Sequence, residues 1–266
     1  MPAPRVRGAR HAGARLWEVD AARTFAIGLM VIYHVAYDVD LLAAEVALDL
    51  RAGGWLALQV TCASLFLALV GTSFWIAHQR GRSRGLSGVA LWRTHARRGV
   101  EVLVAAALVS VATRIALGPV DAVRFGILHL IALALLVVLP VMVRLGLWNA
   151  VIGLAAVGIG VVINDMGSAV PGALVLGLDP GYAGEDWYPL LPWIGASLVG
   201  LAAGALLYPD GERGPRLRRL VRAPRRARLI GAPGRHSLPF YLLHQPVLIV
   251  LTGIVLAVAG ADVEWP

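Results

Sequence analysis

The chain has 266 residues, of which 58% are hydrophobic and 15% are charged, and its mean hydropathy is +0.73. A soluble domain of this length is less apolar, so the composition indicates a membrane protein. The formal net charge of +8 comes from arginine, because the chain contains no lysine. The arginines lie in short segments between apolar runs, so we do not expect a nucleic-acid partner. Cys62 is the only cysteine, which excludes an intramolecular disulfide framework.

The apolar runs predict seven transmembrane helices. A helix crosses a bilayer core of about 30 Å with about 20 apolar residues. Runs of about this length lie at 22–42, 55–78, 99–117, 124–141, 147–164, 189–208 and 237–259. The expected fold is an all-α, polytopic membrane helix bundle over residues 20–260. A basic tail at 1–19 precedes it, and a short tail at 261–266 follows it.

The placement of arginine predicts the orientation of this bundle. Twenty of the 24 arginines lie in 1–20, 79–98, 142–146 and 209–236, which face one side of the membrane if there are seven spans. Most aspartate and glutamate residues in the loops lie in the segments that face the other side. The positive-inside rule therefore predicts a cytoplasmic N-terminus and an outer C-terminus.

The first run contains two ionisable residues, His34 and Asp38. Such groups cost free energy inside a membrane and usually mark a functional site. Four residues separate them, which places them on one helical face, and His34 lies roughly 20 Å along the helix from Asp20. We interpret His34 as a general base and Asp38 as its orienting partner. In the structural alternative, Asp38 ends the span at the headgroups and His34 hydrogen-bonds a neighbouring helix.

Polar residues of other runs could join this pair. His129 lies about one turn inside the outer end of its run and is the second candidate for the base. Asp186 precedes the sixth run, so we expect it to converge with His34 and His129 near the outer face. His244 lies in the cytoplasmic half of the last run and need not join them. These histidines lie on different runs without an HxxxH or HExxH spacing, so no metal site is predicted.

Five segments together resemble a bacterial or archaeal member of the heparan-α-glucosaminide N-acetyltransferase catalytic-domain family. They are WEVDAARTFAIGLMVIYHVAYDVD, SLFLALVGTSFWIAHQR, RFGILHLIALALL, DWYPLLPWIGASLVGLAAG and GRHSLPFYLLHQPVL, in that order, from about residue 15 to 255. The resemblance implies an integral-membrane acyltransferase in the plasma membrane of a prokaryote. It would move an acetyl group from cytoplasmic acetyl-CoA to a sugar, a glycolipid or another envelope acceptor near the outer face. Acetyl-CoA would be a co-substrate rather than a tightly bound cofactor, and the resemblance leaves a homodimer open.

The resemblance also gives tentative roles to residues outside the His34 pair. Arginine binds phosphate well, so the arginines that border spans are candidates for the CoA phosphates, although topology and attraction to anionic lipid would explain most of them. Asp186 with Trp187 and Trp193 would bind the acceptor, although tryptophans at a membrane surface more often form an aromatic belt. The candidates for donor binding are Arg97, Arg98, Arg235 and His244, and Asp20 and Arg23 form a structural motif of the first segment.

The proposed catalytic histidine of the lysosomal branch has no counterpart at the same place. In that branch it follows the first span, whereas residues 39–60 here contain no histidine. The position of His34 looks like an asparagine in the lysosomal branch. Our hypothesis therefore gives the catalytic task to His34. The large luminal domain of the lysosomal enzymes is not seen in this chain, so heparan sulfate is not the substrate that we expect.

Two other classes compete with an acyltransferase. A transporter, or a protein that handles lipid or glycan without acyl transfer, would also have a polar cavity between helices. We find no paired discontinuous helices in two related halves, which mark many transporters. A seven-span photoreceptor would need a lysine for its retinal Schiff base, and the chain has none.

Overall fold

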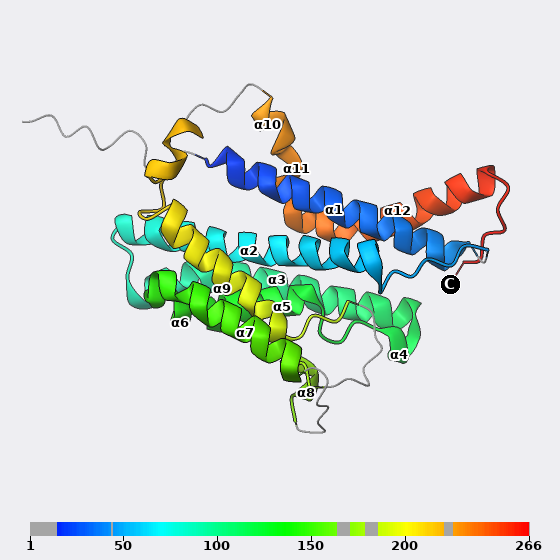
Figure 1. Ribbon diagram of the computed structural model, residues 1–266, viewed down its shortest axis with the longest axis horizontal. Coiled ribbons are helices and arrows are strands. Elements are labelled where there is room, and N and C mark those ends of the chain that lie inside the picture. Colours follow the sequence, from blue (N-terminus) through cyan, green and yellow to red (C-terminus); the bar gives the residue numbers. More distant parts are fainter. Residues whose placement is uncertain (1–14, 44, 164–170, 179–185, 221–225, 266) are drawn as a thin grey trace, which may run out of the picture.

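The computed structural model describes residues 15–43, 45–163, 171–178, 186–220 and 226–265. These residues form helices and contain no strand, so the predicted all-α class is confirmed (Figure 1). Three short elements are not α-helical: η1 is a π-helix, and η2 and η3 are 3₁₀ helices. In chain order the elements are α1 (Trp17–Leu42), α2 (Gly53–Ser83), α3 (Gly88–Ala116), α4 (Gly118–Asp121), α5 (Ile127–Leu133), η1 (Ala134–Val138), α6 (Leu139–Met142), η2 (Val143–Trp148), α7 (Asn149–Ile163), α8 (Ala173–Leu176), α9 (Leu190–Leu207), η3 (Pro215–Leu220), α10 (Ala227–Ile230), α11 (Ala232–Arg235) and α12 (Ser237–Val258).

Among these residues, six helical stretches are long and apolar enough to cross a membrane. The stretch from Ile127 to Ile163 has 37 residues and is divided at Gly146, whose backbone is not helical (φ 52°, ψ −121°). The Asn149 side chain closes this turn by donating hydrogen bonds to the carbonyls of Met142 and Gly146, both at 2.9 Å. The chain turns back here, and α7 then runs along α9 (Figure 1). The predicted number of about seven spans is therefore confirmed.

The described helices extend beyond the predicted apolar runs. α2 continues to Ser83 instead of ending at 78, and α3 begins at Gly88 instead of 99. Residues 79–83 and 88–98 are rich in arginine, which has a high helix propensity although it is too polar for a bilayer core. Hydropathy marks the membrane-spanning part of such a helix and does not mark where the helix ends.

One end of the bundle carries most of the described arginines, and we call it the arginine end. The start of α1, the turn between α2 and α3 and the segment after α9 lie toward this end, at the left of Figure 1, whereas α12 begins nearer the middle and runs to the right. A partly buried ion pair joins two of these parts, because the Arg213 guanidinium donates to both carboxylate oxygens of Glu18 at 2.7 and 2.8 Å. The Tyr208 hydroxyl donates to the same carboxylate, and burial together with the negative charge of Glu18 raises the pKa of Tyr208.

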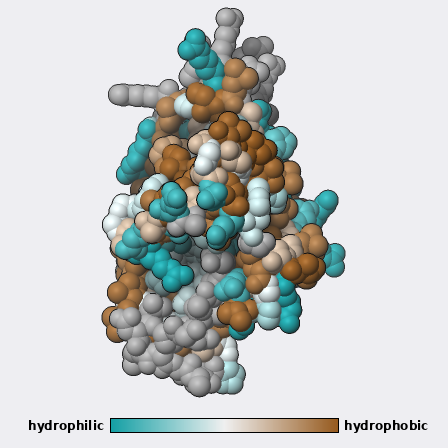
Figure 2. Space-filling view, turned by 90° about the vertical axis from the view of Figure 1, so that its right-hand side faces the viewer, coloured by the Kyte–Doolittle hydropathy of each residue, from teal (hydrophilic) through white to brown (hydrophobic). Residues whose placement is uncertain are grey.

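The opposite end holds the C-terminal end of α1 and the last residues of α12, at the right of Figure 1. The C-terminal segment folds back here, because Val263 forms an isolated antiparallel bridge with Ala43 and the Glu264 N–H donates to the Leu42 carbonyl at 3.0 Å. Figure 2 views the molecule from this end and shows hydrophilic residues interspersed among hydrophobic ones.

α2 packs closely against α9, and glycine makes this approach possible. A Cβ atom at Gly71 would collide with the Ser197 carbonyl, and one at Gly200 would collide with the Ala68 carbonyl. The Thr72 hydroxyl donates to the Gly200 carbonyl across the same contact at 2.8 Å. Small residues of the second run, in α2, thus permit this close helix packing.

The sides of the bundle are apolar and exposed. On α3 the exposed hydrophobic side chains follow helical spacing: Val100, Val104, Leu108, Val111 and Ile115. Similar exposed rows lie on α7 and α12. A soluble monomer rarely exposes contiguous apolar surface of this extent, so these faces fit the acyl chains of a bilayer.

Candidate active site

His34 lies in the second half of α1, where its ring meets α12. Its Nδ1 hydrogen-bonds the Met30 carbonyl, one turn earlier, at 2.8 Å. A carbonyl can only accept, so Nδ1 carries the ring proton and Nε2 of the neutral ring keeps its lone pair. The ring also meets His244 edge to face, with ring centroids 4.5 Å apart. His34 thus provides a basic nitrogen at the contact between α1 and α12.

Asp38 is fully buried and is held by α12 rather than by His34. Its Oδ1 accepts a hydrogen bond from Nε2 of Gln245 at 2.6 Å. The expected hydrogen bond between Asp38 and His34 does not form, because the Nδ1 proton of His34 goes to its own helix and the carboxylate is taken by the neighbouring one. Among the described residues, the second carboxylate oxygen and Oε1 of Gln245 have no hydrogen-bond partner.

His244 belongs to this group, although its sequence position had left it lower in the membrane. Its Nδ1 hydrogen-bonds the Tyr241 carbonyl at 2.5 Å, so its Nε2 also keeps the lone pair when the ring is neutral. That Nε2 is buried without a partner in the described part of the chain. The Tyr241 ring lies 5.5 Å from the His244 ring, centroid to centroid. α12 therefore extends the polar group from His34 by about one turn toward its own N-terminal end.

Asp186, which lies before α9, continues this group of polar side chains through a hydrogen bond with Tyr241. Its Oδ2 accepts hydrogen bonds from the Tyr241 hydroxyl at 3.1 Å and from the Ile127 N–H, at the start of α5, at 3.3 Å. A side chain at Gly126 would collide with the carboxylate, so the glycine permits this approach. Asp186 has a left-handed backbone (φ 50°), which is uncommon for a residue other than glycine and often occurs at functional sites.

His129 lies one turn into α5, beside the same junction. Its Nδ1 accepts the Gly126 N–H at 3.2 Å, so the neutral ring carries its proton on Nε2. The expected convergence of His129 with Asp186 is therefore found. His34 reaches them only through His244 and Tyr241. Polar groups thus form a connected line from α1 through α12 to α5.

The two tryptophans near this line have contacts within the protein. The Trp187 indole N–H donates to the Leu174 carbonyl at 3.0 Å, and the Trp193 ring meets Tyr188 edge to face at 4.7 Å between centroids. These contacts fix the loop before α9. Binding of the acceptor by either tryptophan remains a prediction.

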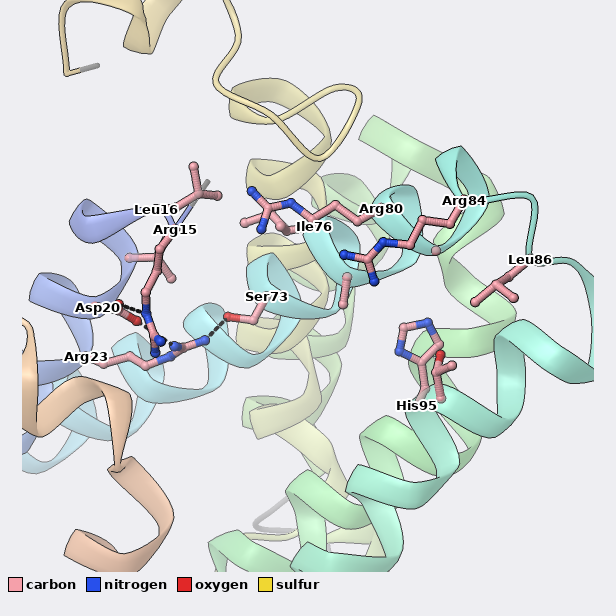
Figure 3. A pocket seen from close by; sticks show the side chains of 14 residues that line it. Arg15, Leu16, Asp20, Arg23, Ser73, Ile76, Arg80, Arg84, Leu86 and His95 are labelled. Carbon is pink, nitrogen blue, oxygen red and sulfur yellow. Dashed lines mark hydrogen bonds and ion pairs between the residues drawn. The ribbon is translucent and has the colours of Figure 1, made fainter. Parts of the chain in front are cut away.

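A cavity of about 380 Å³ opens at the arginine end, between the starts of α1 and α3 and the end of α2 (Figure 3). Asp20 and Arg23 lie on its wall: Arg23 forms an ion pair with Asp20 at 3.3 Å and donates to the Ser73 hydroxyl on α2. Arg15 contacts the other Asp20 oxygen at 2.7 Å. Arg23 thus joins α1 to α2, and Asp20 holds Arg23 in place.

The arginines that sequence position favoured for the donor lie elsewhere. Arg97 and Arg98 are exposed on α3, and both pair with Glu101. Neither they nor Arg235, at the end of α11, line the cavity. Their role in binding CoA remains a prediction.

Sequence reasoning missed several residues of this site. Gln245 and Tyr241 were not assigned a role, although Tyr241, His244 and Gln245 follow one another at spacings of three and one in an otherwise apolar run. Spacings of three and four place polar residues on one helical face, which could have indicated that Tyr241 and His244 act together. No three His, Cys, Asp or Glu side chains among the described residues come together as a metal site would require.

Comparison with known proteins gives one match. The family model described as "Heparan-alpha-glucosaminide N-acetyltransferase, catalytic" matches residues 15–246. Neither the curated proteins nor the solved structures gave a match. The matched region contains the ends of the polar line and the wall of the cavity. The chain therefore belongs to the heparan-α-glucosaminide N-acetyltransferase catalytic-domain family.

Proposed function

We propose that this membrane protein transfers an acetyl group from acetyl-CoA, which enters at the arginine end, to a sugar or other envelope acceptor at the opposite end. The family implies a membrane acetyltransferase. The donor, the acceptor and the two sides are our inference. The arginine end would be cytoplasmic by the positive-inside rule, which matches the side where acetyl-CoA is made.

The observation that carries this proposal is the orientation of the His34 ring. The Met30 carbonyl holds the proton on Nδ1, so Nε2 is the acceptor nitrogen. A general base needs such a lone pair within reach of the acceptor proton. An acyl transfer needs a base of this kind, because a neutral hydroxyl or a protonated amine attacks a thioester poorly.

In the proposed step, His34 Nε2 takes the proton of the acceptor hydroxyl or amine as its oxygen or nitrogen attacks the thioester carbonyl. The bond from carbon to sulfur then breaks, and the imidazolium returns a proton to the leaving thiolate of CoA. The His244 ring packs against His34 and limits its rotation. Asp38 and Gln245 lie one turn further along and add a buried negative charge on the same side of α1.

His129 suits a different task. Its Nδ1 is occupied by the Gly126 N–H, so the neutral ring presents an N–H on Nε2. Such a group donates to an oxygen and does not remove a proton. We therefore assign His129, with Asp186, to orienting the acceptor rather than to removing its proton.

The proposal is tested with membranes that contain the chain, incubated with acetyl-CoA labelled in its acetyl group. Extraction and mass spectrometry identify any labelled product. His34→Gln keeps a donor for the Met30 carbonyl but has no basic nitrogen, so it should lower turnover by about 10²- to 10⁴-fold. His129→Gln should lower it less. Wild-type turnover by a folded His34→Gln protein would refute His34 as the base, and movement of an acceptor across the membrane without any labelled product would support the transporter class.

A further inference from the structure

The cavity at the arginine end is strongly basic. Four arginines and one carboxylate line it, and apolar side chains form much of the rest of its wall. The charges at the start of α1 partly compensate one another, because the Asp20 carboxylate contacts both Arg15 and Arg23. The charged and hydrogen-bonding residues of the wall are Arg15, Asp20, Arg23, Ser73, Arg80, Arg84, Thr94 and His95.

Arg80, near the end of α2, and Arg84, directly after it, both line the cavity. Arg80 donates to the Gly211 carbonyl at 2.9 Å and pairs with Glu212 at 3.3 Å, which fixes its side chain at the wall. Arg84 forms no hydrogen bond or ion pair with the described residues. Figure 3 shows both guanidinium groups extending from α2 into the space between α1 and α3. One of the two groups is thus positioned by the protein and the other is available to a ligand.

His95 supplies an independent observation. It lies on α3 with only 7% of its surface exposed, and its ring packs against Phe74 at 4.2 Å between centroids. Its Nε2 is buried and has no hydrogen-bond partner among the described residues. Buried polar atoms normally have a partner, so one without any indicates a missing ligand or water. Figure 3 shows this ring projecting toward the guanidinium of Arg84.

We propose that this cavity binds the phosphate groups of a nucleotide, with Arg80 and Arg84 as the charged ligands and His95 as a hydrogen-bonding ligand. Guanidinium groups bind phosphate oxygens bidentately, and a dianionic phosphomonoester satisfies several such donors at once. The volume of about 380 Å³ lies in the range of small-molecule sites. The apolar wall, which includes Leu16, Ile76 and Leu86, would contact the nucleoside part rather than a bare phosphate ion.

This inference rests on the proposed function only for its biological meaning, since the nucleotide would be that of the acetyl donor. The binding itself can be measured without any acetyl transfer. Binding without transfer would leave the site standing and refute the proposed function. Transfer without binding would refute the site and leave the proposed function standing.

The test uses the full chain in nanodiscs of a zwitterionic lipid, titrated calorimetrically with adenosine 3′,5′-bisphosphate and, for comparison, with adenosine. The wild type should bind the bisphosphate and not adenosine at the same concentrations. Arg84→Gln should weaken binding by about tenfold or more, because it removes a charge-assisted hydrogen bond. Arg82→Gln is the matched control: it removes the same charge from the same end of α2, but Arg82 is exposed and outside the cavity wall. It should change the affinity by less than about twofold, as expected for an exposed charge screened by salt.

His95→Phe tests the uncharged ligand. Phenylalanine can pack beside Phe74 but cannot hydrogen-bond a phosphate, so the affinity should fall while the thermal midpoint of the nanodisc-embedded protein holds or rises. Equal losses for Arg84→Gln and Arg82→Gln would overturn the site, as would wild-type affinity in both Arg84→Gln and His95→Phe.

A phosphate of a lipid headgroup offers the same chemistry, and a second arm distinguishes it. Native mass spectrometry of the protein from nanodiscs with phosphatidylglycerol would show a retained lipid that Arg84→Gln loses. Retention of this lipid together with failure to bind the bisphosphate would overturn the nucleotide assignment.

Discussion

At the scale of single residues, backbone carbonyls decide what each histidine can do. Met30 and Tyr241 carbonyls fix the Nδ1 protons of His34 and His244, whereas the Gly126 N–H fixes the opposite tautomer in His129. These histidines thus differ in which ring nitrogen carries the proton when the ring is neutral. No spacing in the sequence reveals this difference, because it depends on which backbone group each ring reaches.

The buried pair Asp38 and Gln245 leads to the first prediction. Asp38→Asn keeps an oxygen that can accept the Gln245 hydrogen bond, so the protein should fold and its KM for acetyl-CoA should change little. Loss of the buried charge one turn from His34 should lower kcat by roughly tenfold or more, because the imidazolium formed during transfer loses a nearby negative charge.

Gln245→Leu tests the hydrogen bond to Asp38 separately from the Asp38 charge. It keeps the Asp38 charge but removes its hydrogen-bond donor, which should destabilise the protein by about 1–3 kcal/mol, measured as a lower midpoint of thermal unfolding. If Asp38→Asn left kcat unchanged, Asp38 would have a structural role only.

At the scale of elements, the helices could be predicted better than their contacts. The apolar runs located each membrane-crossing helix, including both halves of the stretch divided at Gly146, because hydropathy follows directly from composition. The lateral order of the helices depends on shape complementarity between faces. The sequence therefore identified His34 and Asp38 as unusual, but it could not show that Gln245 of α12 would take the carboxylate.

The contact between α2 and α9 gives the second prediction. Gly200→Ala places a methyl group against the Ala68 carbonyl, so the helices must separate and the protein should lose about 1–3 kcal/mol of stability. Gly158→Ala is the matched control, because a Cβ at Gly158 on α7 has no neighbour within 4 Å. It should leave the thermal midpoint unchanged or raise it, since alanine favours helix over glycine. Equal midpoints for the two variants would contradict the close packing of α2 on α9.

At the scale of the whole molecule, the separation of charge between the two ends predicts orientation. The third prediction uses single cysteines in a Cys62→Ser background, labelled in intact cells with a membrane-impermeant maleimide. Cysteines at Ser87 and Asp210, at the arginine end, should react only after permeabilisation. Cysteines at Asp49 and Asp262, at the opposite end, should react in intact cells. All four positions are exposed, so a reversed pattern would mean that the arginine end faces outward.

The proposed function assigns separate roles to the polar line and to the basic cavity within one helix bundle. Composition and charge predicted that arginine gathers at one end. The basic cavity could not be predicted, because its wall combines arginines at the start of α1 and the end of α2 with a histidine from α3, and only the packing of these three helices brings them together.

The most direct test of the account measures transfer from one side to the other in sealed vesicles. Labelled acetyl-CoA, which does not cross membranes, is added to inverted vesicles, where the arginine end would be outside, and to right-side-out vesicles. We expect labelled, acetylated product on the luminal side of inverted vesicles, at least about tenfold more than with right-side-out vesicles or with His34→Gln. Equal labelling from both sides, or labelling only in right-side-out vesicles, would contradict transfer from the arginine end to the opposite end.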